Sequence, residues 1–304
     1  MKWTINNMPA LNEKVIIVTG GNSGLGFESV KAFATQGATV ILACRDLKKG
    51  DKARIAILNQ IPNASIAVMQ LDIANLNSVR LFADRYNSEY NRLDILLNNA
   101  GIMMTPYSKT VDGIESQQGT NHFGHFALTA LLFDKLKQTP NSRVINVSSI
   151  AHKQGKMDFD NLLYENGKNY NRYEAYSRSK LENLLFTFGL QAYMKQNKLN
   201  MVALAAHPGV SDTNLFSTIG SKTLQKILRP ILNLFMQSAS MGALPQIRAA
   251  VDVSVTGGEY FGPNGFKEMK GYPVLVKPAN HAFNEKHISE LWEISQKITG
   301  IRFP

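Results

Sequence analysis

The feature that most constrains the fold of this chain is a regular alternation of short apolar runs with stretches of helical character between Lys14 and Asn146. The runs are VIIVT at 15–19, TVILA at 39–43, SIAVM at 65–69, DILLN at 94–98 and RVIN at 143–146. They are continuously apolar, which is typical of parallel strands covered on both faces. Parallel strands need crossover helices, so we predict an α/β protein with a doubly wound parallel sheet and helices on both faces.

The remainder of the 304 residues extends this pattern. We expect a long helix over 173–197, a further buried strand over 201–207 and an amphipathic helix over 285–298. A doubly wound sheet commonly uses a chain of this length as one unit, so residues 1–304 are predicted to form a single Rossmann domain.

Two stretches interrupt the pattern. Residues 151–174 are rich in Gly, Asn, Lys and Tyr and are predicted to be a surface insertion. Residues 214–241 are apolar along one side. They are either a lid over the substrate or an amphipathic helix pair that packs on the body and is interrupted at Pro230.

The first apolar run leads directly into a glycine-rich sequence, TGGNSGLG at 19–26, which a helical stretch over 27–36 follows. Glycines there permit a tight turn and let the backbone approach a pyrophosphate, while the helix N-terminus faces the anion. This context favours dinucleotide binding over a plain glycine-rich turn, and a kinase-type P-loop is disfavoured because no GK[ST] follows. The residues predicted to bind the cofactor here are Gly20, Asn22, Ser23, Gly24, Leu25 and Gly26.

The end of the second apolar run, ACRD at 43–46, bears on the choice between NAD and NADP. NAD-binding proteins place a carboxylate there against the ribose 2′-hydroxyl, whereas Arg45 offers a planar set of donors that suits a 2′-phosphate. We therefore predict a preference for NADP(H), with NAD(H) as the alternative if Asp46 points inward. After the third run, Asp72 and Ile73 are predicted to meet the adenine, although Asp72 could equally cap a helix.

A tyrosine and a lysine, Tyr176 and Lys180, lie four residues apart near the start of the long predicted helix, so they share one helix face. A free tyrosine has a pKa of about 10, and a nearby ammonium group favours the phenolate, which suits proton exchange at neutral pH. The pair alone could also be a surface Tyr and Lys. Ser148 and Ser149 after the fifth run, with NNAG at 98–101 after the fourth, make the catalytic interpretation more specific.

Together these motifs resemble the short-chain dehydrogenase/reductase family over nearly the whole chain. The matching strings are TGxxxGxG at 19–26, NNAG at 98–101, NVSS at 146–149, YxxxK at 176–180 and PGxxxT at 208–213. Longer strings are similar to the retinol-dehydrogenase-like branch and its soluble bacterial-type relatives: ILACRD at 41–46, LDILLNNAGIM at 93–103, TNHFGHFALT at 120–129 and INVSSIAH at 145–152. Because the chain begins close to its first strand, we expect no membrane anchor before it.

The resemblance implies that Tyr176 donates or accepts the reacting proton and that Ser149, not Ser148, holds the substrate oxygen. Lys180 is then expected to lower the pKa of Tyr176 and to bind the nicotinamide ribose, while Asn121 keeps a water of the proton relay. On the same basis the residues expected at the cofactor are Asn98, Ala100, Gly101, Tyr176, Lys180, Pro208, Gly209 and Thr213.

The predicted reaction is hydride transfer between NADP(H) and a carbonyl or alcohol carbon. Nucleotide-sugar epimerases and dehydratases share the fold and the Tyr-Lys pair but usually show a TGxxGxxG spacing. NADP-sensing regulators keep the glycine loop but typically lose the tyrosine or the lysine. Both remain as alternative functions. The expected pocket residues favour a bulky lipophilic ketone, aldehyde or alcohol as the substrate: Ile102, Met103, Met104, Leu215 and Phe216.

The composition disfavours several other classes of protein. The net charge of +10 is spread along the chain without a nucleic-acid motif, so no nucleic-acid partner is expected. No apolar run approaches the roughly 20 residues of a membrane span, and the first residues lack a signal-peptide pattern, so a soluble, cytoplasmic protein is predicted. Cys44 is the only cysteine, which excludes an internal disulfide and a cysteine-built zinc site.

Two further expectations concern metal binding and the oligomeric state. His122 and His125 lie close together, but with no third ligand beside them we expect no metal site. The stretch between Ser149 and Tyr176 is longer than in the simplest members of the family. Such extra chain could cover the helix bundle through which many members dimerise, so the protein is expected to be a monomer or a homodimer.

Overall fold

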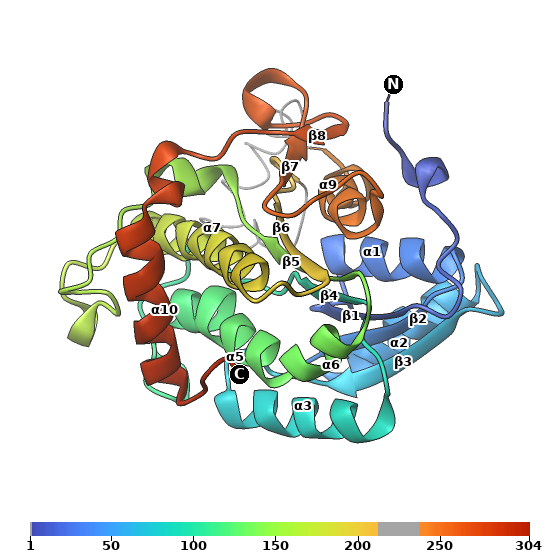
Figure 1. Cartoon of the computed structure of the whole chain (residues 1–304), viewed down its shortest axis with the longest axis horizontal. Coiled ribbons are helices and arrows are strands. Elements are labelled where there is room, and N and C mark those ends of the chain that lie inside the picture. The colour runs from blue at the N-terminus through green and yellow to red at the C-terminus, as the bar shows by residue number, and fades with distance from the viewer. Residues whose placement is uncertain (1, 212–236) are drawn as a thin grey trace, which may run out of the picture.

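The fold is built around one eight-stranded sheet, seen in a computed structural model that describes residues 2–211 and 237–304 (Figure 1). The strand order is β3-β2-β1-β4-β5-β6-β7-β8, and all neighbours are parallel except β7 and β8. The strands are β1 (Val15–Thr19), β2 (Thr39–Cys44), β3 (Ser65–Gln70), β4 (Ile95–Asn98), β5 (Ser142–Val147), β6 (Met201–Ala206), β7 (Tyr260–Pro263) and β8 (Pro273–Leu275).

Helices cover both faces of the sheet (Figure 1). One face carries α1 (Gly24–Thr35), α2 (Leu47–Leu58) and α9 (Ala239–Val251), and the other carries α3 (Leu76–Glu89), α5 (Gly124–Leu131), α6 (Phe133–Gln138) and α7 (Arg172–Gln196). A further helix, α10 (Glu285–Thr299), packs against α7 and α5. The short helices are η1 (Ile5–Asn7), α4 (Ser116–Gln118), η2 (Gly119–Phe123), η3 (Ile150–Gln154), η4 (Glu165–Gly167), η6 (Phe266–Glu268) and η7 (Asn280–Phe283).

Alternate residues of each central strand enter two separate hydrophobic cores. In β1, Ile17 packs beneath α3, α5 and α7, whereas Ile16 and Val18 pack beneath α1, α2 and α9. All three side chains are fully buried. Because successive side chains of a strand point to opposite faces, a strand covered on both faces has to be apolar at every position. This requirement produced the continuous apolar runs.

The doubly wound fold and the strands predicted from those runs are confirmed, and β1 has the predicted bounds. The predictions missed β7, β8 and α9. Pro245 lies inside α9, although proline lacks an N–H and usually ends a helix. The buried packing of α9 against α1 and the sheet stabilises the helix despite this residue.

The structure describes the first of the two interrupting stretches and only the end of the second. The predicted insertion, 151–174, contains most of η3, all of η4 and their connecting turns, and residues 172–174 already belong to α7. Of the candidate lid, residues 214–236 lie outside the described residues, and residues 239–241 begin α9. Among the helices that the structure describes, none is both long and apolar enough to cross a membrane.

Candidate active site

A cavity of ≈ 600 Å³ lies at the carboxyl ends of the strands, where the strand order reverses between β1 and β4. Ligands of doubly wound proteins bind at this reversal. The predicted site residues on the cavity wall are Gly20, Asn22, Ser23, Gly24, Leu25, Gly26, Arg45, Asp72, Ile73, Ala100, Gly101, Tyr176, Lys180 and Pro208. Asn98, Asn121, Ser149 and Gly209 do not line it, and Thr213 lies outside the described residues.

The glycine loop brings its backbone close to the cavity. Gly20 and Gly24 have φ angles of +67° and +54°, a left-handed conformation that glycine adopts without strain. A Cβ on Gly26 would lie 2.3 Å from the carbonyl oxygen of Gly20, so only glycine allows α1 to begin this close to the turn. Thr19 holds the loop in place, since its Oγ1 accepts hydrogen bonds from the backbone N–H groups of Asn99 and Ala100, each at 2.9 Å.

The residues after β2 present two cations and one carboxylate, that of Asp46, to the cavity. β2 ends at Cys44, so Arg45 is the first residue beyond the strand, and its exposed side chain lines the cavity together with Lys49. Asp46 caps α2 by accepting a hydrogen bond from the Lys49 backbone N–H at 3.1 Å. The strand ends at Cys44, one residue after the predicted run at 39–43, and Arg45 still lies beyond it. Lys49 was missed because its approach to the cavity depends on the first turn of α2.

Asp72 also lines the cavity, but its carboxylate is used locally. Oδ1 accepts a hydrogen bond from the backbone N–H of Ala74 at 3.1 Å, and the Asp72 N–H donates to Ser78 Oγ at 3.0 Å. The cap of α3 is Asn75 and not Asp72. Asp72 thus shapes the turn that presents Ile73 to the cavity.

Tyr176 and Lys180, on the first turns of α7, line one end of the cavity. Ser149 follows β5 and does not itself line the cavity, but its side chain lies beside Tyr176. The phenol of Tyr176 is hydrogen-bonded to the side chain of Ser149. Lys180 Nζ lies 5.8 Å from the centroid of the Tyr176 ring and donates a hydrogen bond to the Val147 carbonyl oxygen at 3.0 Å. Both Tyr176 and Lys180 are buried.

Burial is the largest influence on the pKa values of Tyr176 and Lys180. It raises the pKa of Tyr176 to about 12, with the hydrogen bond from Ser149 acting in the opposite direction. Burial also lowers the pKa of Lys180 to about 8. The expected lowering of the Tyr176 pKa by Lys180 is therefore not found in the protein alone, because desolvation of the phenolate outweighs any effect of the ammonium group.

The two neighbouring serines have different surroundings. Ser148 Oγ donates a hydrogen bond to the Lys180 carbonyl oxygen at 2.7 Å and is also bonded to the Tyr260 hydroxyl, so it fastens α7 to the sheet. Ser149 faces Tyr176 instead. Its carbonyl oxygen lies 2.6 Å from Nδ1 of His152, which donates because Nε2 accepts the N–H of Ala279 at 3.1 Å.

Asn121 lies in the π-helical turn η2 beside Gly101. Its Oδ1 accepts the Ile102 N–H at 2.9 Å, and its Nδ2 donates to the Ile102 carbonyl oxygen and to Ser179 Oγ. The Asn121 carbonyl oxygen accepts a hydrogen bond from His125 at 3.1 Å. Its side chain therefore holds the segment after Gly101, and the expected water stays a prediction.

Asn98 has a structural position. Its Nδ2 donates to Asn146 Oδ1 at 2.8 Å and to Thr129 Oγ1 at 3.1 Å, so the side chain crosses between β4, β5 and α5 within the core. The cavity wall at this point is formed by Asn99, Ala100 and Gly101. Asn98 was expected at the cofactor together with Ala100 and Gly101; it does not line the cavity, and its side chain supports the strands that carry this wall.

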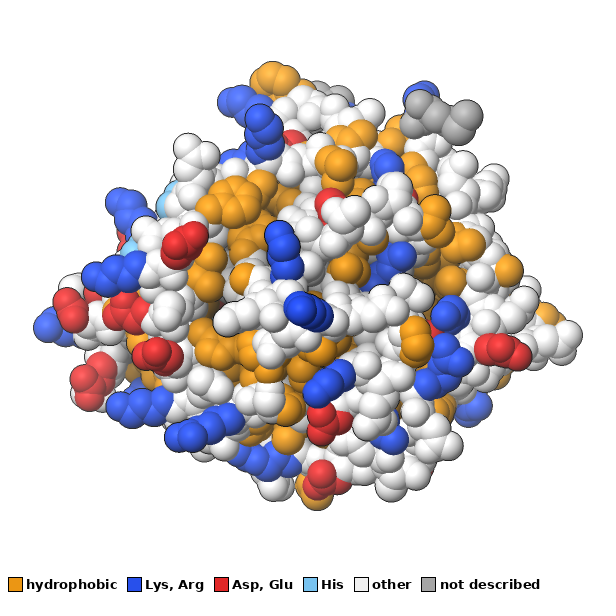
Figure 2. Space-filling view, viewed as in Figure 1, with side chains coloured by type: hydrophobic (Ala, Val, Ile, Leu, Met, Phe, Trp, Pro, Cys, Tyr) orange, Lys and Arg blue, Asp and Glu red, His pale blue; other side chains and the backbone are white. Residues whose placement is uncertain are grey.

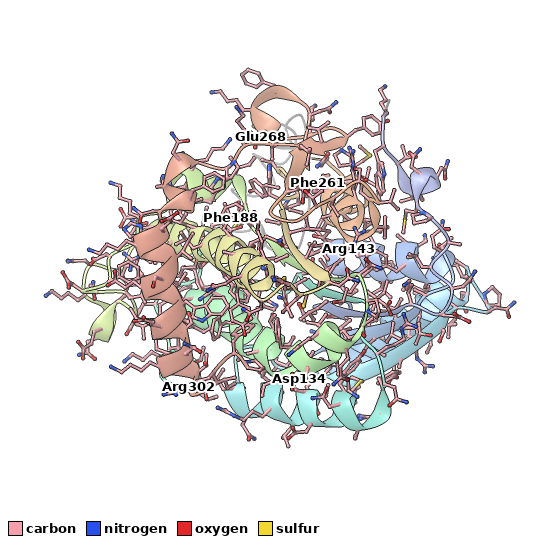
Figure 3. The ribbon with its side chains drawn as sticks, in the orientation of Figure 1. Asp134, Arg143, Phe188, Phe261, Glu268 and Arg302 are labelled. Atoms are coloured by element: carbon pink, nitrogen blue, oxygen red, sulfur yellow. The ribbon has the colours of Figure 1, made fainter. Side chains whose placement is uncertain are left out.

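A buried histidine supports the other side of the site. His207 accepts the Gly209 N–H on Nδ1 at 3.2 Å and donates from Nε2 to Glu268 at 3.0 Å. Glu268, labelled in Figure 3, lies between β7 and β8 and also binds Lys153 Nζ at 2.9 Å. A Cβ on Gly209 would come within 2.3 Å of the Met269 carbonyl oxygen. This network fixes the Pro208-Gly209 turn, and sequence patterns gave no sign of it.

The two histidines considered as metal ligands are buried packing residues. His122 Nε2 lies 2.9 Å from Ser295 Oγ, and His125 Nε2 lies 2.9 Å from Thr19 Oγ1. Burial lowers the pKa of His122 to about 3 and that of His125 to about 4, so both are neutral at ordinary pH. Within residues 2–211 and 237–304, no group of three or more His, Cys, Asp or Glu side chains could hold a metal ion.

The sequence matches the family model described as short chain dehydrogenase over residues 14–224. The chain belongs to the short-chain dehydrogenase family. It is 39% identical over 292 residues to mouse retinol dehydrogenase 12, covering 95% of this chain and 87% of that protein. It is also 39% identical over 296 residues to human retinol dehydrogenase 13, covering 96% of this chain and 86% of that protein. These relatives place this short-chain dehydrogenase in the retinol-dehydrogenase-like branch, as an NAD(P)-dependent oxidoreductase of alcohol or carbonyl groups.

Solved structures agree with this assignment. A protein from Mycobacterium Paratuberculosis superimposes with a TM-score of 0.83 at 37% identity, and the match covers 100% of both chains. A short chain dehydrogenase from Shigella flexneri, complexed with NADP, superimposes with a TM-score of 0.64 at 21% identity, covering 84% of this chain and 98% of that chain. The second likeness concerns the fold of this short-chain dehydrogenase alone.

Proposed function

We propose that this short-chain dehydrogenase reduces lipophilic aldehydes or ketones with NADPH, and catalyses the reverse oxidation of the alcohol, with Tyr176 as the general acid and base. The observation that carries the proposal is the buried Tyr176 phenol, hydrogen-bonded to Ser149 at the end of the cavity, with Lys180 one helical turn away. A phenol that keeps its proton at neutral pH is suited to protonate a developing alkoxide.

The cavity wall suits a dinucleotide. The Gly20 and Gly26 backbones approach so closely that a side chain would fill the space between them, as a pyrophosphate-binding turn requires. Ser23 precedes α1 without a side-chain cap, and the first N–H groups of that helix can therefore meet an anion. Bound NADPH would supply the hydride that the carbonyl carbon receives.

Side chains of this protein would then orient the substrate and transfer a proton to its carbonyl oxygen. Ser149 Oγ and the Tyr176 hydroxyl together can hold one carbonyl oxygen, and Tyr176 gives its proton to that oxygen as hydride arrives. The resulting phenolate is stabilised by the Lys180 cation, which is held toward it by the Val147 carbonyl oxygen. Tyr176 and Lys180 are both buried, which limits the access of bulk water to the phenol.

The preference for NADPH over NADH rests on Arg45 and Lys49. Both line the cavity beyond β2, where a 2′-phosphate of the adenosine ribose would lie. The carboxylate that could have bound a ribose 2′-hydroxyl, that of Asp46, is held by the N–H of Lys49. On the face shown in Figure 2, basic side chains are interspersed with acidic ones.

The lipophilic character of the substrate rests on the groups around the phenol. Met103, Met104 and Ala151 form an apolar cluster with Tyr176. Met103 is the member of this cluster, besides Tyr176, that lines the cavity, so the chain or ring of a substrate whose carbonyl oxygen reaches Tyr176 would lie against it. The relatives in this branch are named for retinol, a lipophilic alcohol, and this agrees with such a pocket.

The proposal is tested by titrating the purified protein with NADPH and NADH, followed by assays with decanal and all-trans-retinal. We expect tighter binding of NADPH, an affinity for NADPH that falls about tenfold or more in Arg45→Ala, and little change in NADH binding. Lys48→Ala is the matched control, because Lys48 is exposed on α2 but does not line the cavity. Equal binding of both dinucleotides, or no NADPH-dependent loss of either aldehyde, would contradict the proposal.

A further inference from the structure

The segment after Gly101 supplies the apolar surface beside the catalytic phenol. Met103 is buried and Met104 half-buried, and both pack in the cluster that contains Tyr176 and Ala151. We call Met103 and Met104 the methionine wall. Thr105, the next residue, lines the cavity. The position of the methionine wall therefore decides how much room a substrate has beside Tyr176.

The backbone of the methionine wall is in an unfavourable conformation. Met104 has a φ angle of +52°, in the left-handed region that side chains other than those of Gly, Asn and Asp rarely adopt. A residue keeps such a conformation only when its surroundings fix it from several sides. The contacts of Met104 and Thr105 show which residues do so.

Gln117 fixes the backbone of Met104. Its side chain is fully buried, and Oε1 accepts the Met104 N–H at 2.8 Å. Its Nε2 donates to the Tyr170 hydroxyl at 2.8 Å and to the Arg172 carbonyl oxygen at 3.0 Å. The orientation of the Gln117 amide is thus set by residues at the end of the 151–174 insertion and the start of α7.

Tyr170, in the 151–174 insertion, fixes the backbone of the next residue, Thr105. Its hydroxyl donates to the Thr105 carbonyl oxygen at 2.9 Å, and Glu115 Oε1 lies 3.3 Å away. Its ring makes edge contacts with Tyr107 and Tyr164, each with centroids 5.2 Å apart. Burial, and after it the neighbouring Glu115, raises the pKa of Tyr170 to about 12, so the hydroxyl remains a donor at all ordinary pH values.

The insertion that carries Tyr170 is itself fastened to the catalytic helix. Arg178, two residues after Tyr176, donates from Nη1 to the carbonyl oxygens of Asn161 and Leu162, each at 2.9 Å. Its guanidinium group lies 4.4 Å from the centroid of the Tyr164 ring. One rigid connection therefore runs from α7 through the insertion to Tyr170 and back to the methionine wall.

We infer that Tyr170 is a positioning residue that sets substrate specificity: with Gln117 it fixes the methionine wall against Tyr176, and so shapes the surface on which the apolar chain of a carbonyl substrate lies. This inference rests on the proposed carbonyl reductase function. It assigns the insertion a task within the active site, because the Gln117 amide binds the backbone of Met104 and the Tyr170 hydroxyl binds the backbone of Thr105, the residue that follows the methionine wall.

The test compares Tyr170→Phe with Tyr164→Phe. Both tyrosines belong to the insertion, but the Tyr164 hydroxyl has no hydrogen-bond partner among the described residues, so its removal is the matched control. For Tyr170→Phe we expect KM for decanal to rise about fivefold to tenfold, while kcat for propanal and the Kd for NADPH change less than about twofold. Tyr164→Phe should leave all of these values at the wild-type level.

A second variant guards against a folding defect. Glycine adopts the backbone conformation of Met104 without strain, so Met104→Gly should fold while it removes half of the methionine wall. It should lower the preference for decanal over propanal as Tyr170→Phe does. Equal losses with both aldehydes in Tyr170→Phe, or an unchanged preference in both variants, would overturn the inference.

A spectroscopic measurement separates this inference from the proposed function. In protein labelled with [methyl-13C]methionine, Tyr170→Phe should shift or broaden the Met103 and Met104 methyl resonances, whereas Tyr164→Phe should leave them in place. If the wild type reduces neither aldehyde, the proposed function fails, but these resonances still decide whether Tyr170 positions the wall. Unmoved Met103 and Met104 resonances in Tyr170→Phe would overturn the inference by themselves.

Discussion

Lys180 lies one helical turn beyond Tyr176, with its Nζ 5.8 Å from the centroid of the phenol ring and 3.0 Å from the Val147 carbonyl oxygen. The carbonyl fixes the ammonium group near the phenol, yet burial lowers the Lys180 pKa to about 8 and raises that of Tyr176 to about 12. At neutral pH the pair is therefore a neutral phenol beside a cation. This is the protonation state that the proposed carbonyl reduction requires.

The first prediction concerns the pH dependence of the reduction. Because a lysine with a lowered pKa keeps its cation only below that pKa, and the phenol stays protonated, kcat/KM should be level from about pH 6 to about pH 8 and should fall above it. The measurement is a pH profile with decanal. Lys180→Arg is the control, since its guanidinium stays charged: it should be slower, but its profile should lack the fall above about pH 8. A rise above that pH in the wild type would contradict this account.

The second prediction concerns the proton donor. Tyr176→Phe removes only the hydroxyl, so the variant should fold and bind NADPH like the wild type but lose activity by on the order of a hundredfold or more. Thermal unfolding and an NADPH titration check the first part, and steady-state turnover checks the second. Tyr173→Phe is the control, because Tyr173 lies on the first turn of α7 and its hydroxyl bonds to Gln154, away from the cavity wall. Comparable turnover in Tyr176→Phe and the wild type would remove the phenol from the mechanism.

The third prediction separates the adjacent serines. Ser148→Ala loses the bond to the Lys180 carbonyl oxygen, so its free energy of unfolding should fall by about 1 kcal/mol with activity largely kept. Ser149→Ala loses the group that faces Tyr176, so kcat/KM should fall by on the order of a hundredfold. It also loses the cap that accepts the Ala151 N–H, so its free energy of unfolding should fall by about 1 kcal/mol as well. Urea unfolding and turnover of both variants provide the comparison, because the two should lose similar stability but differ in activity. A larger loss of activity in Ser148→Ala than in Ser149→Ala would show that the assignment of the two serines is wrong.

The predictions that the structure supports were based on residues that lie close together in the sequence. The apolar runs, the glycine loop and the Tyr176-Lys180 pair are each defined over a few residues, and local geometry places them in the fold. The position of Arg45 just beyond β2 could be predicted because that strand ends with its last apolar residue, Cys44.

The missed features join distant segments. His207 meets Glu268 across 61 residues of sequence, and Gln117 meets Tyr170 across 53. No short pattern marks either contact, because each exists only after the sheet has brought the loops together. The raised pKa of Tyr176 was missed for a related reason: desolvation depends on burial by the whole fold.

The last prediction concerns the ion pairs behind the Pro208-Gly209 turn. The hydrogen bond from His207, and after it the one from Lys153, lowers the pKa of Glu268 from 4.5 to about 2. Burial lowers the pKa of His207, and its Nδ1 accepts the Gly209 N–H, so we regard His207 as neutral and Lys153 as the cation of this network. A carboxylate with a lowered pKa stabilises the fold above its unfolded value, and that stabilisation is lost as the pH falls toward the folded one.

Glu268→Gln should therefore lower the free energy of unfolding by about 1–2 kcal/mol at pH 7, and the difference from the wild type should shrink between about pH 4.5 and about pH 2. Urea unfolding at pH 7 and at about pH 3.5 measures both parts. Glu293→Gln on the exposed side of α10 is the control and should show neither effect. The variant should also bind NADPH more weakly, because the His207 ring that holds the Gly209 N–H loses its charged partner. A difference in stability that stays constant with pH would mean that the charge of Glu268 does not support this turn.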